Sequence, residues 1–140
     1  SSYGRPSMST IKTNTLTGTT SAGSINVTGE GGSTTTNLQQ GLAKVWVNVQ
    51  QASSYSTRDS FNLSSHSDEG TGKSRLTFTN SFGSLNHSAS GMASNLNNFV
   101  GNDNTNHEQT ASTIQVAVYD GGGSAQDGSF VTISIHGDLA

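Results

Sequence analysis

Residues 42–50 read LAKVWVNVQ, and this stretch carries the pattern that decides the fold. Val45, Val47 and Val49 fall at every second position, which predicts a β-strand whose valine face is buried in a core. Trp46 then lies on the opposite face of the strand. We expect another subunit or a loop to cover its indole ring, because a large apolar side chain on an open face usually marks a contact.

Four further runs show the period of two that is typical of half-buried strands. They are RDSFNLS at 58–64, KSRLTFTNSF at 73–82, STIQVAVYD at 112–120 and SFVTISIHGD at 129–138. One or two shorter strands are expected between residues 85 and 101. The total of roughly six or seven strands, spaced by turn-forming residues, predicts an all-β protein whose residues 42–140 form an antiparallel, jelly-roll-like β-sandwich head.

Turn-forming residues between these runs predict two hairpin connections. HSDEGTG at 66–72 joins the runs at 58–64 and 73–82, and Phe61 with Leu63 is expected on one core-facing side. GGGSAQDG at 121–128 joins the last two runs as a flexible hairpin loop. GNDNTNHEQ at 101–109 is a polar loop by composition, and the residues after the last strand are expected to be tied into the sheet.

Apolar side chains are scarce in this chain of 140 residues. Hydrophobic types make up 29% of it, and Ser, Thr, Asn and Gly dominate the rest. Typical globular domains hold roughly 45–50% apolar residues, Gly included. Only 11% of the residues are charged and Pro occurs once, which argues against a disordered chain. A chain this polar buries little surface alone, so we expect subunit contacts to complete its core.

Residues 8–41 are interpreted as a short fibre stem with a helical neck. Isolated apolar residues interrupt a run of small polar ones, and two short strands cannot make a core, because a lone hairpin is marginal in water. In an intertwined homotrimer each apolar residue would meet its symmetry mates on the axis; a disordered linker is the alternative. The expected trimer-interface residues are Ile11, Leu16, Ile25, Val27, Leu38 and, from the head, Trp46.

A helix-start signature lies in STTTNLQQG at 33–41. Thr36 can accept a hydrogen bond from a first-turn amide, Gln39 can reach back, and Gly41 can close the turn, which predicts one helical turn as the neck. Residues 1–7, SSYGRPS, precede Met8, where the regular pattern starts. They are interpreted as a cloning remnant or as a native flexible terminus.

Charge and residue types exclude several classes of function. The net charge is −3 with only six Lys and Arg, so no basic stripe and no nucleic-acid partner are expected. No apolar run is long enough to span a membrane and no signal-peptide core is present, so we expect a soluble product without its own export signal. The chain has no Cys, which excludes disulfides and thiolate metal sites.

No arrangement of residues points to catalysis, so we expect a non-enzymatic protein without catalytic residues, metal or cofactor. Most of the nine acidic residues fall in predicted turns. Asp68, Glu69, Asp120 and Asp127 flank glycines, where an acid is favoured because it caps the turn backbone. The four histidines lack the close spacing of metal ligands, although one His136 from each of three subunits could meet on an axis. A glycan depolymerase with carboxylates from adjacent subunits also stays open.

Several stretches together resemble tail-fibre and related appendage proteins of marine bacteriophages. They are MSTIKTNTLTGTTSAGSINVTGEG at 8–31, TTTNLQQGLAKVWVNV at 34–49 and TRDSFNLSSHSDEGTGKSRLTFTNSF at 57–82, with the turn at 68–72 and the closing strand at 131–138. The resemblance implies a repeat-like fibre stem followed by a compact β head. It also implies virion location, homotrimer formation and no chemistry.

The leading hypothesis is therefore a structural and adhesive virion protein, made in the host cytoplasm. Its expected partners are copies of itself, other virion proteins and a host surface glycan or protein. A capsid-surface decoration or knob protein is the alternative, because the stem is short for a fibre. Aromatic and amide groups suit sugar stacking and hydrogen bonding, so the expected receptor contacts are Tyr55, Asp68, His107, Tyr119 and Gln126.

Overall fold

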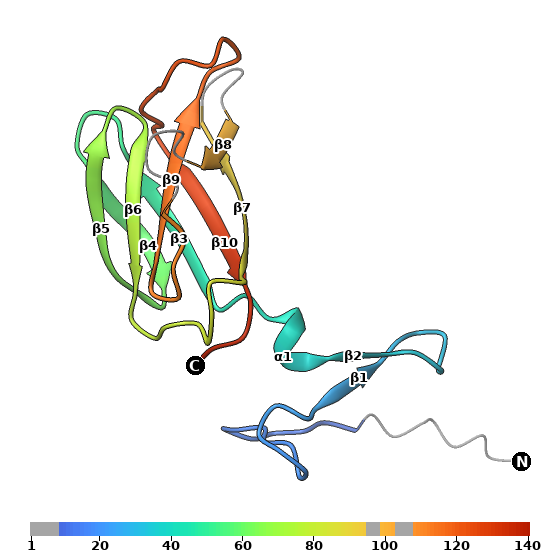
Figure 1. The fold of residues 1–140 in the computed structure, drawn as a ribbon. Coiled ribbons are helices and arrows are strands. Elements are labelled where there is room, and N and C mark those ends of the chain that lie inside the picture. Colours follow the sequence, from blue (N-terminus) through green and yellow to red (C-terminus); the bar gives the residue numbers. More distant parts are fainter. Residues whose placement is uncertain (1–8, 95–98, 103–107) are drawn as a thin grey trace, which may run out of the picture. The chain divides into compact units, whose positions relative to one another are not determined.

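The computed structural model describes residues 9–94, 99–102 and 108–140 (Figure 1). The chain divides into two compact units, residues 1–38 and residues 39–140. In the described residues every strand pair is antiparallel, and the only helix is a single turn of four residues. The prediction of an all-β protein is confirmed for this part of the chain.

The first unit contains one short hairpin. β1 (Asn26–Thr28) pairs antiparallel with β2 (Thr35–Asn37). None of the described side chains of this unit is buried, and Ile11, Leu16 and Val27 are 81%, 54% and 50% exposed. A two-stranded hairpin is marginal in water, so the described residues of this unit do not account for a stable fold by themselves.

The helical turn of the neck begins later than expected. α1 (Leu38–Gly41) is one turn, whereas Thr36 lies within β2. The predicted Thr36 cap is therefore wrong, because this β-branched residue takes a strand conformation and a cross-strand partner in the hairpin. The ammonium group of Lys44 closes the turn by donating to the backbone carbonyl oxygens of Gln39 and Leu42.

The second unit is a sandwich of two four-stranded antiparallel sheets, which Figure 1 shows stacked face to face. Sheet I has the strand order β4-β3-β10-β7 and sheet II has the order β5-β6-β9-β8. The predicted antiparallel β-sandwich is thereby confirmed. The strands of sheet I are β3 (Val45–Gln50), β4 (Ser56–Phe61), β7 (Ser88–Ala93) and β10 (Val131–His136). Those of sheet II are β5 (Leu63–Gly70), β6 (Lys73–Phe78), β8 (Phe99–Asn102) and β9 (Thr113–Tyr119).

The core lies between the sheets and takes alternate residues of four strands, together with Phe82 from the segment after β6. Val45, Val47 and Val49 of β3 are buried, as their spacing predicts, and β6, β9 and β10 contribute in the same way. The complete cluster is Val45, Val47, Val49, Leu76, Phe78, Phe82, Ile114, Val116, Val118, Val131, Ile133 and Ile135. Successive side chains of a strand point to opposite faces, so Trp46 is left on the outer face of sheet I.

The strand order corrects one expectation about connectivity. β3–β4, β5–β6 and β8–β9 are pairs of consecutive strands within one sheet. The loop at 121–128 leads from β9 in sheet II to β10 in sheet I, so it is not a hairpin loop. Periodicity marks strands but does not say which strands pair, because pairing depends on contacts between distant segments.

The run at 58–64 is broken at Asn62, contrary to the expectation of one strand. Phe61 ends β4 in sheet I and is 53% exposed, whereas Leu63 begins β5 in sheet II and packs against the core. The stretch at 66–72, expected to be a turn, belongs mostly to β5, and only its end turns the chain into β6. The two residues predicted to share a core face therefore lie in different sheets.

Asn62 forms the corner between the sheets. Its φ is 58°, in the left-handed region that Asn tolerates better than most residues. The Nδ2 group donates to the carbonyl oxygens of Lys44 at 3.0 Å and Asn80 at 3.1 Å, and Oδ1 accepts from the backbone amide of Asn80 at 2.7 Å. These bonds join the corner to Lys44, which precedes it in the sequence, and to Asn80, which follows it.

Two further predictions are confirmed in the last third of the chain. β7 and β8 are the strands expected between residues 85 and 101. The residues after β10 pair with the segment after β6: Leu139 forms a bridge with Phe82, and Gly83 N donates to Asp138 O at 2.8 Å. Most of the expected loop at 101–109 lies outside the described residues.

We predict that Asn62→Ala lowers the free energy of unfolding by about 2–3 kcal/mol, because it removes several hydrogen bonds and strains a left-handed residue. Asn62→Gly relieves the backbone strain and isolates the loss of the side-chain bonds. Urea unfolding followed by circular dichroism measures both variants. Asn86→Ala, in an exposed loop, is the control and should change the free energy by less than about 0.5 kcal/mol. Equal effects at the two positions would contradict the corner role.

Candidate functional site

Three loops gather at one end of the sandwich, which we call the loop end. They are residues 51–55, residues 70–72 and residues 120–130. The side chain of Gln51 joins them, since its Nε2 donates to Gly72 O at 2.9 Å and its Oε1 accepts from Gly128 N at 3.0 Å. Gln51 is buried with both ends of its amide bonded, as a buried polar group requires. Directional hydrogen bonds therefore set the positions of these loops.

Gly72 is the point where the β5–β6 turn meets the loop after β9. Its φ is 71°, and a Cβ atom there would lie 2.7 Å from the carbonyl oxygen of Val118. Its backbone amide donates to Asp127 Oδ1 at 2.6 Å. Only glycine combines this conformation with this close backbone approach.

Four of the five predicted receptor contacts lie at the loop end. Tyr55 immediately precedes β4 and Asp68 is near the end of β5, while Tyr119 ends β9 and Gln126 follows it. The side chains of Asp68 and Gln126 are exposed, and those of Tyr55 and Tyr119 are half-buried. His107, the fifth, lies outside the described residues.

A buried polar cluster beneath the loop end has Ser74 at its centre. Ser74 Oγ accepts a hydrogen bond from Gln51 Nε2 at 2.8 Å, and it lies 2.8 Å from Tyr55 Oη and 3.2 Å from His66 Nε2. The rings of Tyr55 and His66 stack with their centroids 4.1 Å apart. The single proton of Tyr55 Oη is directed to the backbone carbonyl oxygen of Ser67, 2.6 Å away, so the Ser74 hydroxyl is left to donate to Tyr55 Oη or to His66 Nε2.

Partial burial shifts the pKa values of both rings. It lowers the pKa of His66 from 6.5 to about 4, opposed in part by the charge of Asp68. Burial likewise raises the pKa of Tyr55 to about 12, although its hydrogen bond to Ser74 acts in the other direction. Ser74 is fully buried and its oxygen is already bonded, so the Ser74–His66 contact offers no nucleophile to a substrate.

Three carboxylates at the loop end accept hydrogen bonds from glycine amides: Asp68 and Asp120 cap their own turns, as their position beside glycines predicts, whereas Asp127 bonds to a glycine of another loop. Each accepts a bond from a glycine amide: Asp68 from Gly70 at 2.8 Å, Asp120 from Gly122 at 2.9 Å and Asp127 from Gly72 at 2.6 Å. The backbone bond from Ser124 is the main reason that the pKa of Asp120 is lowered. Glu69, the fourth acid beside these glycines, forms an ion pair with Arg75 at 3.7 Å.

The described residues contain neither a cluster of metal-ligating side chains nor a membrane-spanning helix. No group of three or more His, Asp or Glu side chains in this part of the chain is placed to hold a metal ion. His136, the candidate for an axial site, lies half-buried at the end of β10. No helix in residues 9–94, 99–102 and 108–140 has the length and hydropathy needed to cross a membrane.

The outer face of sheet I carries exposed apolar side chains that the sequence pattern did not reveal as a group. Trp46, Phe61 and Met92 are 40%, 53% and 65% exposed, and Trp46 lies directly opposite Phe61 on the neighbouring strand. A groove of about 600 Å³ separates Trp46 from Met92. Phe61 was assigned to the core because the break at Asn62 cannot be recognised from the alternation alone.

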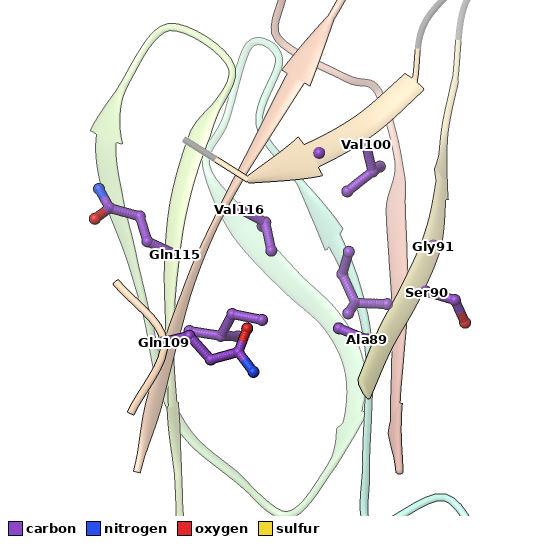
Figure 2. Close-up of a pocket in the computed structure, with 10 residues that line it drawn as sticks. Ala89, Ser90, Gly91, Val100, Gln109, Gln115 and Val116 are labelled. Carbon is purple, nitrogen blue, oxygen red and sulfur yellow. The ribbon is translucent and has the colours of Figure 1, made fainter. Parts of the chain in front are cut away.

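A smaller hollow of about 190 Å³ lies between the two sheets beside β7 and β8. Figure 2 shows Val100 and Val116 pointing into it, whereas the side chains of Ser90 and Gln115 point away. The Nε2 group of Gln109 already donates to two backbone carbonyl oxygens. Both protons of this amide are therefore already used.

A scan of the sequence against protein-family models and searches of curated proteins and of solved structures find no match to this chain. Its function therefore has to be argued from its own residues and their geometry.

We predict that the head loses stability as the pH falls from 6.5 towards 4. In this window the unfolded histidine, with a pKa of about 6.5, binds a proton, whereas folded His66, with a pKa of about 4, does not. Protonation therefore favours unfolding, and this contribution is fully present only above pH 6.5. His66→Gln, whose amide oxygen can accept from Ser74, should remove this part of the acid sensitivity. Urea unfolding at several pH values measures the free energy of unfolding of both proteins. If this free energy changes equally with pH in both, the assignment of the acid sensitivity to His66 is contradicted.

Proposed function

We propose that this chain is a non-enzymatic structural and adhesive protein of a bacteriophage virion, a tail fibre or fibre-like appendage that works as a homotrimer. The observation that carries the proposal is the first unit, whose large apolar side chains are exposed and whose described residues have no core. The resemblance of the stem and head motifs to marine phage appendages supports a place in the virion after synthesis in the host cytoplasm. Other virion proteins are then its neighbours.

In a trimer, the first units of the three copies would cover one another's apolar side chains. Ile11, Leu16 and Val27 lose contact with water in such an assembly, and burial of apolar surface contributes roughly 25 cal/mol per Å². A threefold axis brings each residue next to its own symmetry mates. Ile25 and Leu38, the other stem residues of the expected interface, are half-buried and linked by a bond from Leu38 N to Ile25 O at 2.8 Å.

The loop end of the head supports an adhesive role. Gln51 and the turn-capping carboxylates hold the loops in place, and loops that are already ordered lose less entropy on binding. Asp68 and Gln126 are exposed at this end, and Tyr119 is half-buried. These groups suit contact with a host surface glycan or protein.

The hydrogen bonds of the carboxylates favour an adhesive role over that of a glycan depolymerase. Asp68 and Asp120 accept backbone amides of their own turns, and Asp127 accepts the amide of Gly72, so all three stabilise the loops. Glycoside hydrolysis needs a pair of carboxylates that flank the scissile bond, one of them protonated. The bonds at Asp120 lower its pKa, which is the opposite of what a general acid needs.

A capsid-surface decoration or knob protein is the second candidate function. In this candidate function the sandwich unit of residues 39–140 would serve as the knob. In that role the capsid shell, rather than the host cell, is the main partner.

We expect the purified chain to be a trimer in solution. Light scattering should give three times the chain mass of 14.4 kDa. Ile11→Asp combined with Val27→Asp should give a monomer, because charges on a buried axis lose their hydration. The unfolding of the head should stay unchanged. Asn14→Asp with Asn26→Asp adds the same charge at exposed polar positions and should remain trimeric. A monomeric unmodified chain at micromolar concentration would remove the trimer from the proposal.

An antibody against the head should label the tail appendages of the phage particle in electron micrographs. Label on the capsid would support the decoration role instead. Absence of the chain from purified particles, judged by labelling and by mass spectrometry, would overturn the virion location.

A further inference from the structure

The groove on the outer face of sheet I is built by three neighbouring strands, β3, β10 and β7. Its volume is about 600 Å³, within the usual range for sites that hold small molecules. Alternate residues of each strand face outward and line it. The side chains on this face are Trp46, Asn48, Ser90, Met92, Thr132 and Ser134.

The strand register sets the width of the groove. Ser134 lies between Trp46 and Ser90 in the paired strands, and Thr132 lies between Asn48 and Met92. Neighbouring strands are about 4.8 Å apart, so the walls on β3 and β7 stand about 10 Å apart. Figure 2 shows the Ser90 side chain pointing away from the hollow between the sheets, which is the direction of the groove.

The walls and the floor of the groove have different chemistry. Trp46 offers an aromatic face at one wall and Met92 a flexible thioether at the other. Between them the floor consists of short hydroxyl side chains, with the amide of Asn48 beside them. None of the described side chains that line the groove is ionised at neutral pH, so it suits an uncharged ligand.

This arrangement does not fit a second copy of the chain. Interfaces between proteins have an apolar, dehydrated centre and a polar rim. Here Thr132 and Ser134 are central, on β10, and the apolar side chains stand at the edges, on β3 and β7. A flat apolar partner would leave these hydroxyl groups without hydrogen bonds, at a cost for each. A sugar ring provides both an apolar C–H face and a circle of hydroxyl groups.

We propose that this groove binds a neutral glycan, with one sugar ring packed against the indole of Trp46 and its hydroxyl groups bonded to Ser90, Thr132 and Ser134. Trp46 is thereby assigned to a ligand instead of the trimer interface. The site adds to the adhesive role proposed above and rests on that role only for its biological purpose. Binding itself is a property of the purified chain.

The fluorescence of Trp46 tests the proposal directly, because Trp46 is the only tryptophan of the chain. Neutral hexasaccharides of glucose, mannose, galactose and N-acetylglucosamine are titrated into the purified full chain. At least one should shift the emission to shorter wavelength in a saturable way, since the ring replaces water on the indole. The same sugar should protect Trp46 from quenching by acrylamide.

Variants on the outer faces of sheets I and II distinguish binding in the groove from a general effect of losing a surface hydroxyl group. Thr132→Val keeps the shape of the side chain but removes a floor hydroxyl, and should weaken binding about five- to tenfold, as expected for one hydrogen bond. Trp46→Leu, followed by calorimetry, should lose measurable binding. Thr77→Val makes the same change on the outer face of sheet II and should bind like the unmodified chain.

Three results would overturn the glycan assignment. One is the absence of any response to the four sugars at millimolar concentration. Another is Trp46 emission that changes with protein concentration while the mass rises, which would assign this face to a second copy. The third is equal weakening by Thr132→Val and Thr77→Val. None of these results alters the stem-dependent trimer mass or the labelling of particles, so the proposed function and the glycan site can fail separately.

Discussion

The rest of the structure depends on one constraint, the burial of a single apolar core between two sheets. That core consists of valine, isoleucine, leucine and phenylalanine side chains, most of them at alternate positions of the strands. With 29% hydrophobic residues, the chain has enough apolar material for one core. That core takes the inner faces of β3, β6, β9 and β10. The pairing of β3 with β10 joins strands from the beginning and the end of the head in one sheet. The first unit receives none of this core, which is why its own residues leave Ile11, Leu16 and Val27 exposed.

Side-chain hydrogen bonds hold segments of this sandwich together at places where apolar packing would do so in a less polar domain. Asn62 holds the corner between the sheets, Gln51 joins the three loops, and Ser74 gathers Tyr55 and Gln51 beneath them. Such groups stabilise a fold only when their bonds are made, because an unsatisfied buried polar group costs about 1–3 kcal/mol. Hydrogen bonds are also directional. They therefore give the loop end a defined shape, which suits a surface that contacts a partner.

The two outer faces of the sandwich differ in chemistry, and this difference bears on function. Sheet II carries charged groups on its outer face, where Arg75 pairs with Glu108 at 3.0 Å and with Glu69. Sheet I instead exposes Trp46 and Met92 on either side of a hydroxyl-lined floor. The subunit contacts proposed for the first unit and the ligand contacts proposed for the sandwich would therefore use different parts of the chain.

The sequence by itself determined the main strands and their buried faces, because alternate residues of an extended chain must point to opposite sides. It also determined the turn-capping role of Asp68 and Asp120, which depends only on nearby glycines. Only the tertiary structure decided which strands pair, and where the run at 58–64 breaks. That break depends on bonds from Asn62 to segments some 18 residues away on either side. The groove beside Trp46 likewise combines strands from distant parts of the chain. Alternation is a local property of the sequence, whereas corners, pairing and grooves arise from contacts between segments that the chain brings together only on folding.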